Sequence, residues 1–355
     1  MLFVALTAPL MGAIADMSGI RKRMMMLYTA VCVTGVALFA TLDQGDVLLG
    51  FTLAVIANIG FEGALVFYNA YLPDIAPPAK QGFVSGLGFG VGYLGSLVGL
   101  GVALPLAFAN NFEAIWLAVA GMFAVFSLPT FLILPEGPAR MSVRQAAVEG
   151  FTGFRRIVGE VLADRQLRRF LLAFFFYIDG VLTVILFAGP FAQTTMGFTA
   201  TETIILFAVV QVSALVGALG LARPTDVWGP KRVISLSLLL WIAIAAVTFV
   251  IHTKAAFFAV AVTAGIGLGA IQAASRSFMA ALTPEGKEAE MFGFYAFCGK
   301  SSSILGPFVF GTISSLTGGN QRLSIFSLIA FFVIGLLLLQ RVEDPRRKAV
   351  EAPAP

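Results

Sequence analysis

The sequence predicts an all-α polytopic membrane protein, and its composition and long apolar runs support that prediction. Of its 355 residues, 59% are hydrophobic and only 12% are charged, whereas about a quarter of a soluble domain is charged. The mean hydropathy is +0.93. A membrane span needs ~20 residues, so about eleven spans would use most of the chain. This composition excludes a soluble enzyme, a nucleic-acid-binding protein and a disordered chain.

Apolar runs separated by polar turns predict the individual helices. Strands of a membrane barrel are excluded because they alternate over segments of ~10 residues and contain no long apolar runs. The predicted spans are 1–18, 24–42, 47–72, 82–106, 113–135, 170–193, 201–222, 232–251, 255–281, 290–315 and 323–341.

The basic residues predict which ends of the spans face the cytoplasm, because Lys and Arg collect there in membrane proteins. With the basic cluster at 21–23 in the cytoplasm, the outer loops hold only Lys254 and Arg322. This orientation places Met1 on the outer side. The first run is therefore expected to be a genuine span, since the charges of a signal peptide would precede its apolar run.

Two short motifs repeat at nearly one offset. Asp16-Met-Ser-Gly-Ile-Arg-Lys recurs 210 residues later as Asp226-Val-Trp-Gly-Pro-Lys-Arg, and Pro73-Asp74 recurs 211 residues later as Pro284-Glu285. All four lie in predicted cytoplasmic turns, which favours an internal duplication into two parallel helical bundles. The predicted domains are an N-terminal bundle of five spans at 1–135, a cytoplasmic linker at 136–168, a C-terminal bundle of six spans at 169–341, and a cytoplasmic tail at 342–355.

The linker is the only long polar stretch, and it predicts an amphipathic helix. Its apolar side chains recur at helical spacing, with arginines among them, which is typical of a helix on a membrane surface. Two roles stay open, a tether between the bundles and a regulatory, lipid-sensing helix. The apolar positions are Val143, Ala147, Phe151, Phe154, Val158 and Val161, and the arginines are Arg140, Arg144, Arg155 and Arg156.

Several motifs resemble a known family. The segment Gly12-Ala-Ile-Ala-Asp16-Met-Ser-Gly19-Ile-Arg21-Lys22-Arg23 resembles the signature loop between helices two and three of the major facilitator superfamily. Four further segments resemble the vacuole effluxer family, the autophagy-related vacuolar amino-acid exporters and their bacterial relatives. They are Phe67-Tyr-Asn-Ala-Tyr-Leu-Pro73, Ser85-Gly-Leu-Gly-Phe-Gly-Val-Gly-Tyr-Leu-Gly95, Tyr177-Ile-Asp-Gly180 and Gly299-Lys-Ser-Ser-Ser-Ile-Leu-Gly-Pro307.

The resemblance implies the major-facilitator fold, two pseudo-symmetric bundles with twelve helices in total. This chain would supply helices two to twelve, so its eleven spans lack the first helix. The outward position of Met1 agrees with that reading. We therefore expect the gene to code for an apolar helix, in frame, upstream of Met1.

The signature turns predict a conformational clamp on the cytoplasmic side. An acid at the end of an apolar helix, a glycine that permits a tight turn and a following basic cluster suit a charge contact that forms in one state and breaks in another. For the basic residues, ordinary cytoplasmic anchoring is the alternative. The clamp residues are Asp16, Gly19, Arg21 and Lys22 in the first turn and Asp226, Gly229, Lys231 and Arg232 in its repeat.

Ionisable residues inside the spans predict a polar cavity, because a charge at the bilayer centre costs ~2.5–3.5 kcal/mol on insertion scales. In the family fold these positions fall mainly on helices four, seven and ten, which line the central cavity. Mutual neutralisation of two acids and two bases is the alternative. The predicted cavity residues are Asn58, Glu62, Asn69, Tyr177, Asp179, Gln272, Arg276 and Lys300.

Asp179 is the most informative of these residues because it is expected near the bilayer midplane. It could carry a proton, bind substrate or form a structural ion pair with Arg276 or Lys300, and the sequence leaves the three roles open.

These observations predict a secondary active transporter that moves a small polar solute by alternating access. The resemblance implies amino-acid efflux, with protons as a further partner besides the substrate and the lipid bilayer. A sugar or drug transporter, a lipid flippase and a non-transporting scaffold are the alternatives. Without a Walker motif, paired cysteines or a histidine–acid motif, no cofactor, no metal site and no enzyme activity are expected. The resemblance to bacterial relatives suggests the bacterial inner (plasma) membrane.

Overall fold

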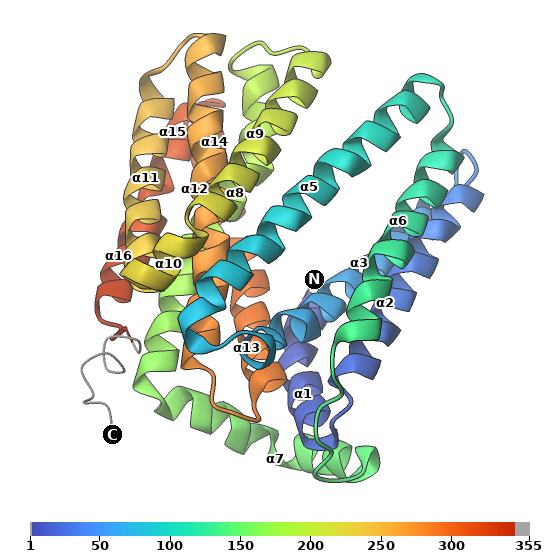
Figure 1. Ribbon diagram of the computed structural model, residues 1–355. Coiled ribbons are helices and arrows are strands. Elements are labelled where there is room, and N and C mark those ends of the chain that lie inside the picture. Colours follow the sequence, from blue (N-terminus) through green and yellow to red (C-terminus); the bar gives the residue numbers. More distant parts are fainter. Residues whose placement is uncertain (1, 345–355) are drawn as a thin grey trace. The chain divides into compact units, whose positions relative to one another are not determined.

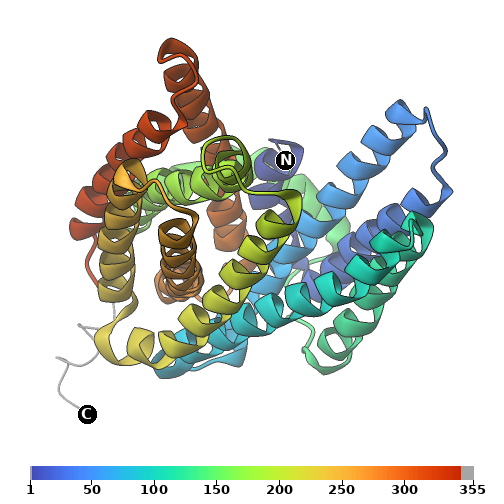
Figure 2. The same cartoon turned by 90° about the horizontal axis from the view of Figure 1, so that it is seen from above.

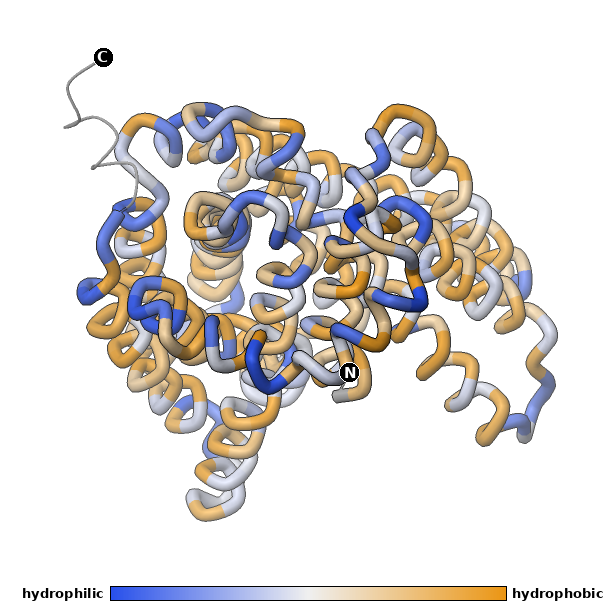
Figure 3. The backbone as a smooth tube through the Cα atoms, turned by 90° about the horizontal axis from the view of Figure 1, so that it is seen from below, coloured by the Kyte–Doolittle hydropathy of each residue, from blue (hydrophilic) through white to orange (hydrophobic). Residues whose placement is uncertain are grey.

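The computed structural model describes residues 2–344, and this part of the chain is helical with no β-strand (Figure 1). Met1 and the end of the predicted tail, 345–355, lie outside the described residues. Coloured by hydropathy, the backbone is mostly hydrophobic along the helices, and hydrophilic residues lie mostly at helix ends and in loops (Figure 3). The prediction of an all-α polytopic membrane protein is confirmed.

Each predicted span coincides with one helix or with two consecutive helices. Nine of them are long and apolar enough to cross a membrane, and α1 is a shorter apolar helix. The spans are α1 (Leu2–Ser18), α2 (Arg21–Leu38), α3 (Val47–Ala70), α5 (Gln81–Phe108), α6 (Phe112–Ile133), α8 (Arg165–Thr194), α9 (Ala200–Gly220), α11 (Pro230–Val250), α12 (Lys254–Leu282), α13 (Glu288–Ser301) with α14 (Leu305–Leu316), and α15 (Gln321–Ser327) with α16 (Ile329–Gln340). The remaining helices are α4 (Leu72–Ile75), α7 (Val143–Ala163) and α10 (Ala222–Trp228).

Local sequence signals explain several helix starts. Asn111 caps α6, and Asp164 accepts the first free amides of α8. Thr199 and Glu202 form a reciprocal capping box at α9. These side chains satisfy backbone donors that have no partner inside the helix.

The described chain divides into two compact units. Within the described residues, unit 1 contains 2–74, 95–159 and 283–297, and unit 2 contains 75–94, 160–282 and 298–344. Each unit therefore includes a short segment from the other half of the sequence, namely the start of α5 in unit 2 and most of α13 in unit 1. The domain boundaries inferred from the repeat stay a prediction.

Small residues bring helices together inside each unit. In unit 1, α2 and α3 run side by side (Figures 1 and 2), and a Cβ added to Gly60 would lie 2.4 Å from the backbone N of Cys32. In unit 2, a Cβ on Gly269 would lie 2.0 Å from the carbonyl O of Ala214, at the contact of α12 with α9. Such close approaches stabilise helices in a bilayer, where apolar burial between helices gives little driving force.

The predicted amphipathic helix of the linker is present as α7. Ala146, Gly150 and Ile157 are buried, and Gly150 packs against Leu10 and Ile14 of α1. The buried face overlaps the predicted stripe only in part, since Val161 on that stripe is buried whereas Phe151 and Val143 are exposed. The packing partner, which periodicity alone does not identify, decides which part of a wide apolar arc is covered.

Candidate functional site

The first signature turn fixes the start of α13 within unit 1. The Asp16 carboxylate accepts the backbone N–H groups of Ala289 and Glu290 at 3.1 and 2.9 Å. These amides lie in the first turn of α13, where helix amides lack internal acceptors and the helix dipole favours an anion. Gly19 ends the preceding helix with a positive φ of 69°. The acid at the end of α1 therefore acts as an anionic cap on α13.

Arg21 connects this cap to two further acids. Its guanidinium lies 3.5 Å from Asp16, 2.9 Å from Asp74 and 3.4 Å from Glu288. Its side chain is buried and lies over the ring of Tyr71. Arg21 is thus part of a partly buried charge cluster, in which loss of one member leaves the others poorly compensated.

The repeated turn makes the equivalent contact within unit 2. Asp226 accepts the N–H groups of Gly82 and Phe83, both at 2.7 Å, in the first turn of α5. Gly229 has a positive φ of 88°, as Gly19 does in the first copy. The second and third amides of α5 and of α13 are thus bound in the same way by the two repeated aspartates.

The basic residues of the two turns differ in their partners. Lys22 donates to the carbonyl O of Leu134, and Lys231 donates to the carbonyls of Gln340 and Val342. Both lysines therefore bind the carbonyl ends of neighbouring helices, a favourable place for a cation. Arg232 is exposed. Both turns therefore share the aspartate contact with a helix start, and the first turn also contains the cluster of Arg21 with Asp16, Asp74 and Glu288.

Glycines make both aspartate contacts possible. A Cβ on Gly82 would lie 2.6 Å from Asp226 Oδ1, and a Cβ on Gly12 would lie 2.1 Å from the carbonyl O of Ala289. Gly86 and Gly90 continue the close contact along α5, whereas nothing lies within 4 Å of a Cβ on Gly92. The glycines of α5 thus permit close contact with α10 and α9 in its first turns, but Gly92 makes no such contact.

Two predicted cavity residues of α12 bind α5 inside unit 2. Arg276 donates to the side-chain and backbone oxygens of Ser85 at 2.9 and 2.7 Å, and its guanidinium lies over the ring of Phe89. Gln272 accepts a 2.7 Å hydrogen bond from Tyr93. Ser85, Phe89 and Tyr93 are spaced four residues apart, so they form one polar and aromatic face of α5 towards α12.

Asp179 on α8 is fully buried and holds the start of α14. It accepts the backbone N–H of Gly306 at 2.8 Å and lies 3.4 Å from the hydroxyl of Thr183. Among the described residues, neither Arg276 nor Lys300 forms an ion pair with it. Two residues before Asp179, the Tyr177 hydroxyl shares a 2.8 Å hydrogen bond with Ser275 of α12.

The span predicted at 290–315 is interrupted near the Asp179 contact. A 3-10 segment, Ser302–Ile304, separates α13 from α14, and the backbone of Ser303 is not helical. Pro307 has no N–H to donate to the carbonyl of Ser303, four residues earlier, and its ring clashes with that carbonyl in a regular helix. Apolar periodicity did not predict the break, although the run of three serines and Pro307 was a local signal.

The remaining predicted cavity residues are distributed between the units. Asn58, Glu62 and Asn69 lie on α3 in unit 1; Glu62 is buried and the two asparagines are half-buried. Lys300 is half-buried at the end of α13, in unit 2. The structure adds residues that the sequence did not single out, namely Ser85, Tyr93, Thr183, Ser275, Glu288 and Gly306. Asp74, which pairs with Arg21, could have been identified from the sequence, because Pro73-Asp74 recurs as Pro284-Glu285.

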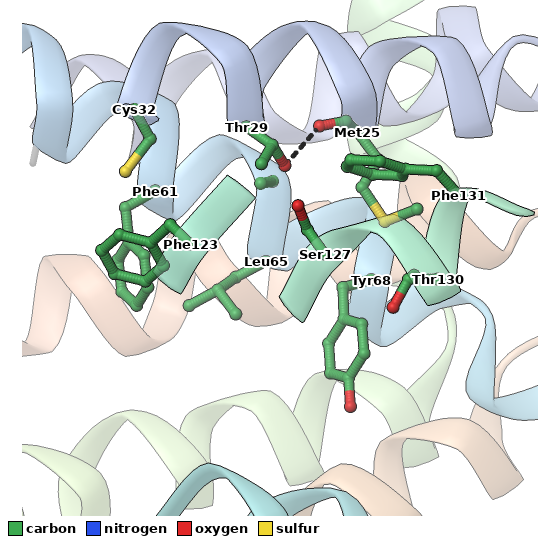
Figure 4. A pocket seen from close by; sticks show the side chains of 11 residues that line it. Met25, Thr29, Cys32, Phe61, Leu65, Tyr68, Phe123, Ser127, Thr130 and Phe131 are labelled. Carbon is green, nitrogen blue, oxygen red and sulfur yellow. Dashed lines mark hydrogen bonds between the residues drawn. The ribbon is translucent and has the colours of Figure 1, made fainter. Parts of the chain in front are cut away.

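A pocket of about 150 Å³ lies between α2, α3 and α6 in unit 1 (Figure 4). The Phe61 and Phe123 rings lie at one end with Cys32, and the Thr29 hydroxyl donates to the carbonyl of Met25. Asn58 and Glu62 are not among its lining residues. The pocket is mainly apolar and is thus distinct from the predicted polar stripe of α3.

Comparison with known proteins agrees with this architecture. The model of the family described as "Vacuole effluxer Atg22 like" matches residues 1–352. An uncharacterised MFS-type transporter, YxiO of Bacillus subtilis, is 29% identical over 96% of this chain and 82% of its own length. Autophagy-related protein 22 of Candida glabrata is 27% identical over 76% of this chain, which spans 57% of that protein's length.

Solved structures share the fold at low identity. The human organic anion transporter MFSD10 superposes with a TM-score of 0.79 and 19% identity, covering 96% of this chain and 81% of its own. The proton:xylose symporter XylE gives a TM-score of 0.76 and 13% identity, covering 99% and 87%. YxiO, MFSD10 and XylE are transporters. The chain therefore belongs to the Atg22-like vacuole effluxer family and is a transporter of the major facilitator type.

Proposed function

We propose that this chain exports amino acids, or closely similar small zwitterions, by alternating access across a bacterial inner membrane. The family description and the polar residues of α3, α8 and α12 support that substrate class. The observation that carries the mechanism is the repeated contact of Asp16 and Asp226 with the first turns of α13 and α5.

Each contact joins opposite halves of the sequence. Asp16 belongs to the first half and binds a segment of the second, while Asp226 belongs to the second half and binds a segment of the first. Movement of one half of the sequence against the other would therefore act on both contacts. Two such contacts, acting together, are suited to stabilise one transport state and to release it in the next.

Charge complementarity favours a zwitterion as substrate. Arg276 and Lys300 could hold a carboxylate, and Glu62 or Asp179 could hold an ammonium group. In the described structure Arg276 binds Ser85, so a role in substrate binding requires it to exchange that partner for the substrate.

Transport by purified protein in proteoliposomes tests this proposal. Vesicles loaded with labelled amino acids should release them faster with the protein than without it, and unlabelled amino acid should compete. Labelled sugars, cationic drugs and fluorescent phospholipids test the alternatives in the same vesicles. The Asp16→Asn variant can be assayed in the same vesicles. Its matched control is Asp43→Asn, because Asp43 is an exposed acid in a loop. If only a sugar, a drug or a phospholipid is moved, the amino-acid proposal is wrong.

A further inference from the structure

The break between α13 and α14 is held by one buried carboxylate. Asp179 comes from α8 and has no exposed surface, and its Oδ2 accepts the N–H of Gly306 in the first turn of α14. Interrupted transmembrane helices expose backbone groups at the middle of the membrane, where coupling ions and substrates bind in many transporters. The Asp179 contact therefore lies where a bound ion could change the helix directly.

We propose that Asp179 is a proton-binding group of this transporter, and that its proton loosens the start of α14 at the Ser302–Ile304 break. The proposal deepens the transport function proposed above and rests on it.

The partners of Asp179 allow its charge to change. They are an amide and a hydroxyl, those of Gly306 and Thr183, and no basic side chain pairs with it in the described part of the chain. Neutralising a carboxylate in a buried ion pair would leave an uncompensated cation. Here protonation removes one charge and leaves no unpaired cation behind.

Other charged groups near this site are few. On the helices that contact α8, the charged residues are Glu288, Glu290 and Lys300 of α13, Lys254 and Arg276 of α12, and Glu202 of α9, while α14 and α16 contain no charged residue. Glu288 and Glu290 lie at the other end of α13 from the break, and Lys254 and Glu202 lie in the first turns of their helices. Arg276 binds Ser85, and Glu202 binds Lys254. Asp179 is thus the acid placed to titrate at the break.

Protonation weakens the hold on α14 for two reasons. Hydrogen bonds to an ionised group are roughly twice as strong as those between neutral groups. The negative charge also interacts favourably with the positive end of the α14 dipole. The contact at Gly306 is tightly packed, since a Cβ there would lie 2.0 Å from Thr183 Oγ1 and 2.6 Å from Asp179 Oδ1.

The break also connects to the first signature turn through α13. The first turn of α13 is bound by Asp16, and the same helix ends at the break that Asp179 holds from the other side. The start of α13 and the start of α14 are thus each held by an aspartate from another helix.

Amide hydrogen exchange in lipid nanodiscs tests the proposal without any transport measurement. The exchange rate of the 304–309 segment is compared in wild type, Asp179→Asn and Asp179→Ala over a pH series. At high pH, Asn should raise exchange by about tenfold and Ala by about a hundredfold, as expected for weakening or losing a hydrogen bond to a charged group. The ratio of Asn to wild type should fall towards one as the pH is lowered and wild-type Asp179 takes up its proton.

Two further measurements sharpen the result. Thr183→Val, which removes the weaker 3.4 Å contact and keeps the carboxylate, should raise exchange less than Asp179→Asn and should retain the pH dependence. The wild-type pH series reports on the proposal even if a variant fails to fold. An Asn-to-wild-type ratio near one at every pH, or a ratio that does not change with pH, would overturn the proposal. A protein that transports no amino acid but shows the pH-dependent ratio would refute the substrate assignment alone.

Discussion

Replacing Asp16 by Asn should release the start of α13 and shift the protein towards the state in which this contact is open. The carboxylate accepts two amides at 3.1 and 2.9 Å and lies 3.5 Å from Arg21, and only 4% of its side chain is exposed. An Asn side chain keeps one acceptor oxygen but places an NH₂ group against the second amide. The variant therefore loses one amide contact and the charge that favours the other.

The expected cost is about 2 kcal/mol. A hydrogen bond to a charged group contributes about 1.5–3 kcal/mol, and a negative charge at a helix N-terminus contributes about 0.3–1 kcal/mol at exposed sites. Because each factor of ten corresponds to about 1.4 kcal/mol, the equilibrium should shift by about 30-fold.

A cysteine placed under the contact measures this shift. Ala289 is fully buried beside Gly12, so Ala289→Cys in a Cys32→Ser/Cys298→Ser background should react with a membrane-impermeant maleimide only when the contact opens. Asp16→Asn should raise the labelling rate by about 30-fold, in proportion to the open population. Asp43→Asn should leave it unchanged. A labelling rate equal to that of the parent protein, in a correctly inserted Asp16→Asn variant, would refute the clamp.

Three further predictions concern single side chains. Asp179→Asn should keep the fold and abolish net transport. Substrate-for-substrate exchange should persist in this variant if Asp179 carries a proton, and should disappear if Asp179 binds substrate. Transport at the wild-type rate, with the wild-type pH dependence, would contradict both roles. Gly12→Ala should raise the maleimide labelling rate of Ala289→Cys by about tenfold, because overpacking costs about 1–3 kcal/mol. Gly92→Ala, with nothing within 4 Å of the new Cβ, should leave that rate unchanged. Equal labelling rates in the two variants would show that the packing at Gly12 does not stabilise the contact. Tyr93→Phe removes a 2.7 Å hydrogen bond to Gln272 and should lower the Tm by about 3 °C in a thermal unfolding assay, and an unchanged Tm would show that the bond contributes nothing.

The major features of the fold could be predicted from the sequence because a membrane imposes strict requirements. Backbone groups in lipid must be satisfied within the segment, so an apolar run of sufficient length has to be helical. The repeated Asp-to-basic motif also located both signature turns, because an acid at the end of an apolar run is conspicuous in this composition. The approximate limits of the spans and the positions of the two turns therefore followed from short-range pattern alone.

The partners of those residues were decided by tertiary structure. Nothing in the neighbourhood of Asp16 or Asp226 indicates that each binds backbone amides more than 140 residues away along the chain. Asp179 could have paired with Arg276 or Lys300 by charge alone, yet it binds the amide of Gly306. Periodicity places a residue on a face of a helix, whereas the element opposite that face depends on how distant segments pack. Which residues are polar inside the membrane can be read from the order of the amino acids, whereas the partner that each of them binds depends on how helices distant in the chain pack together.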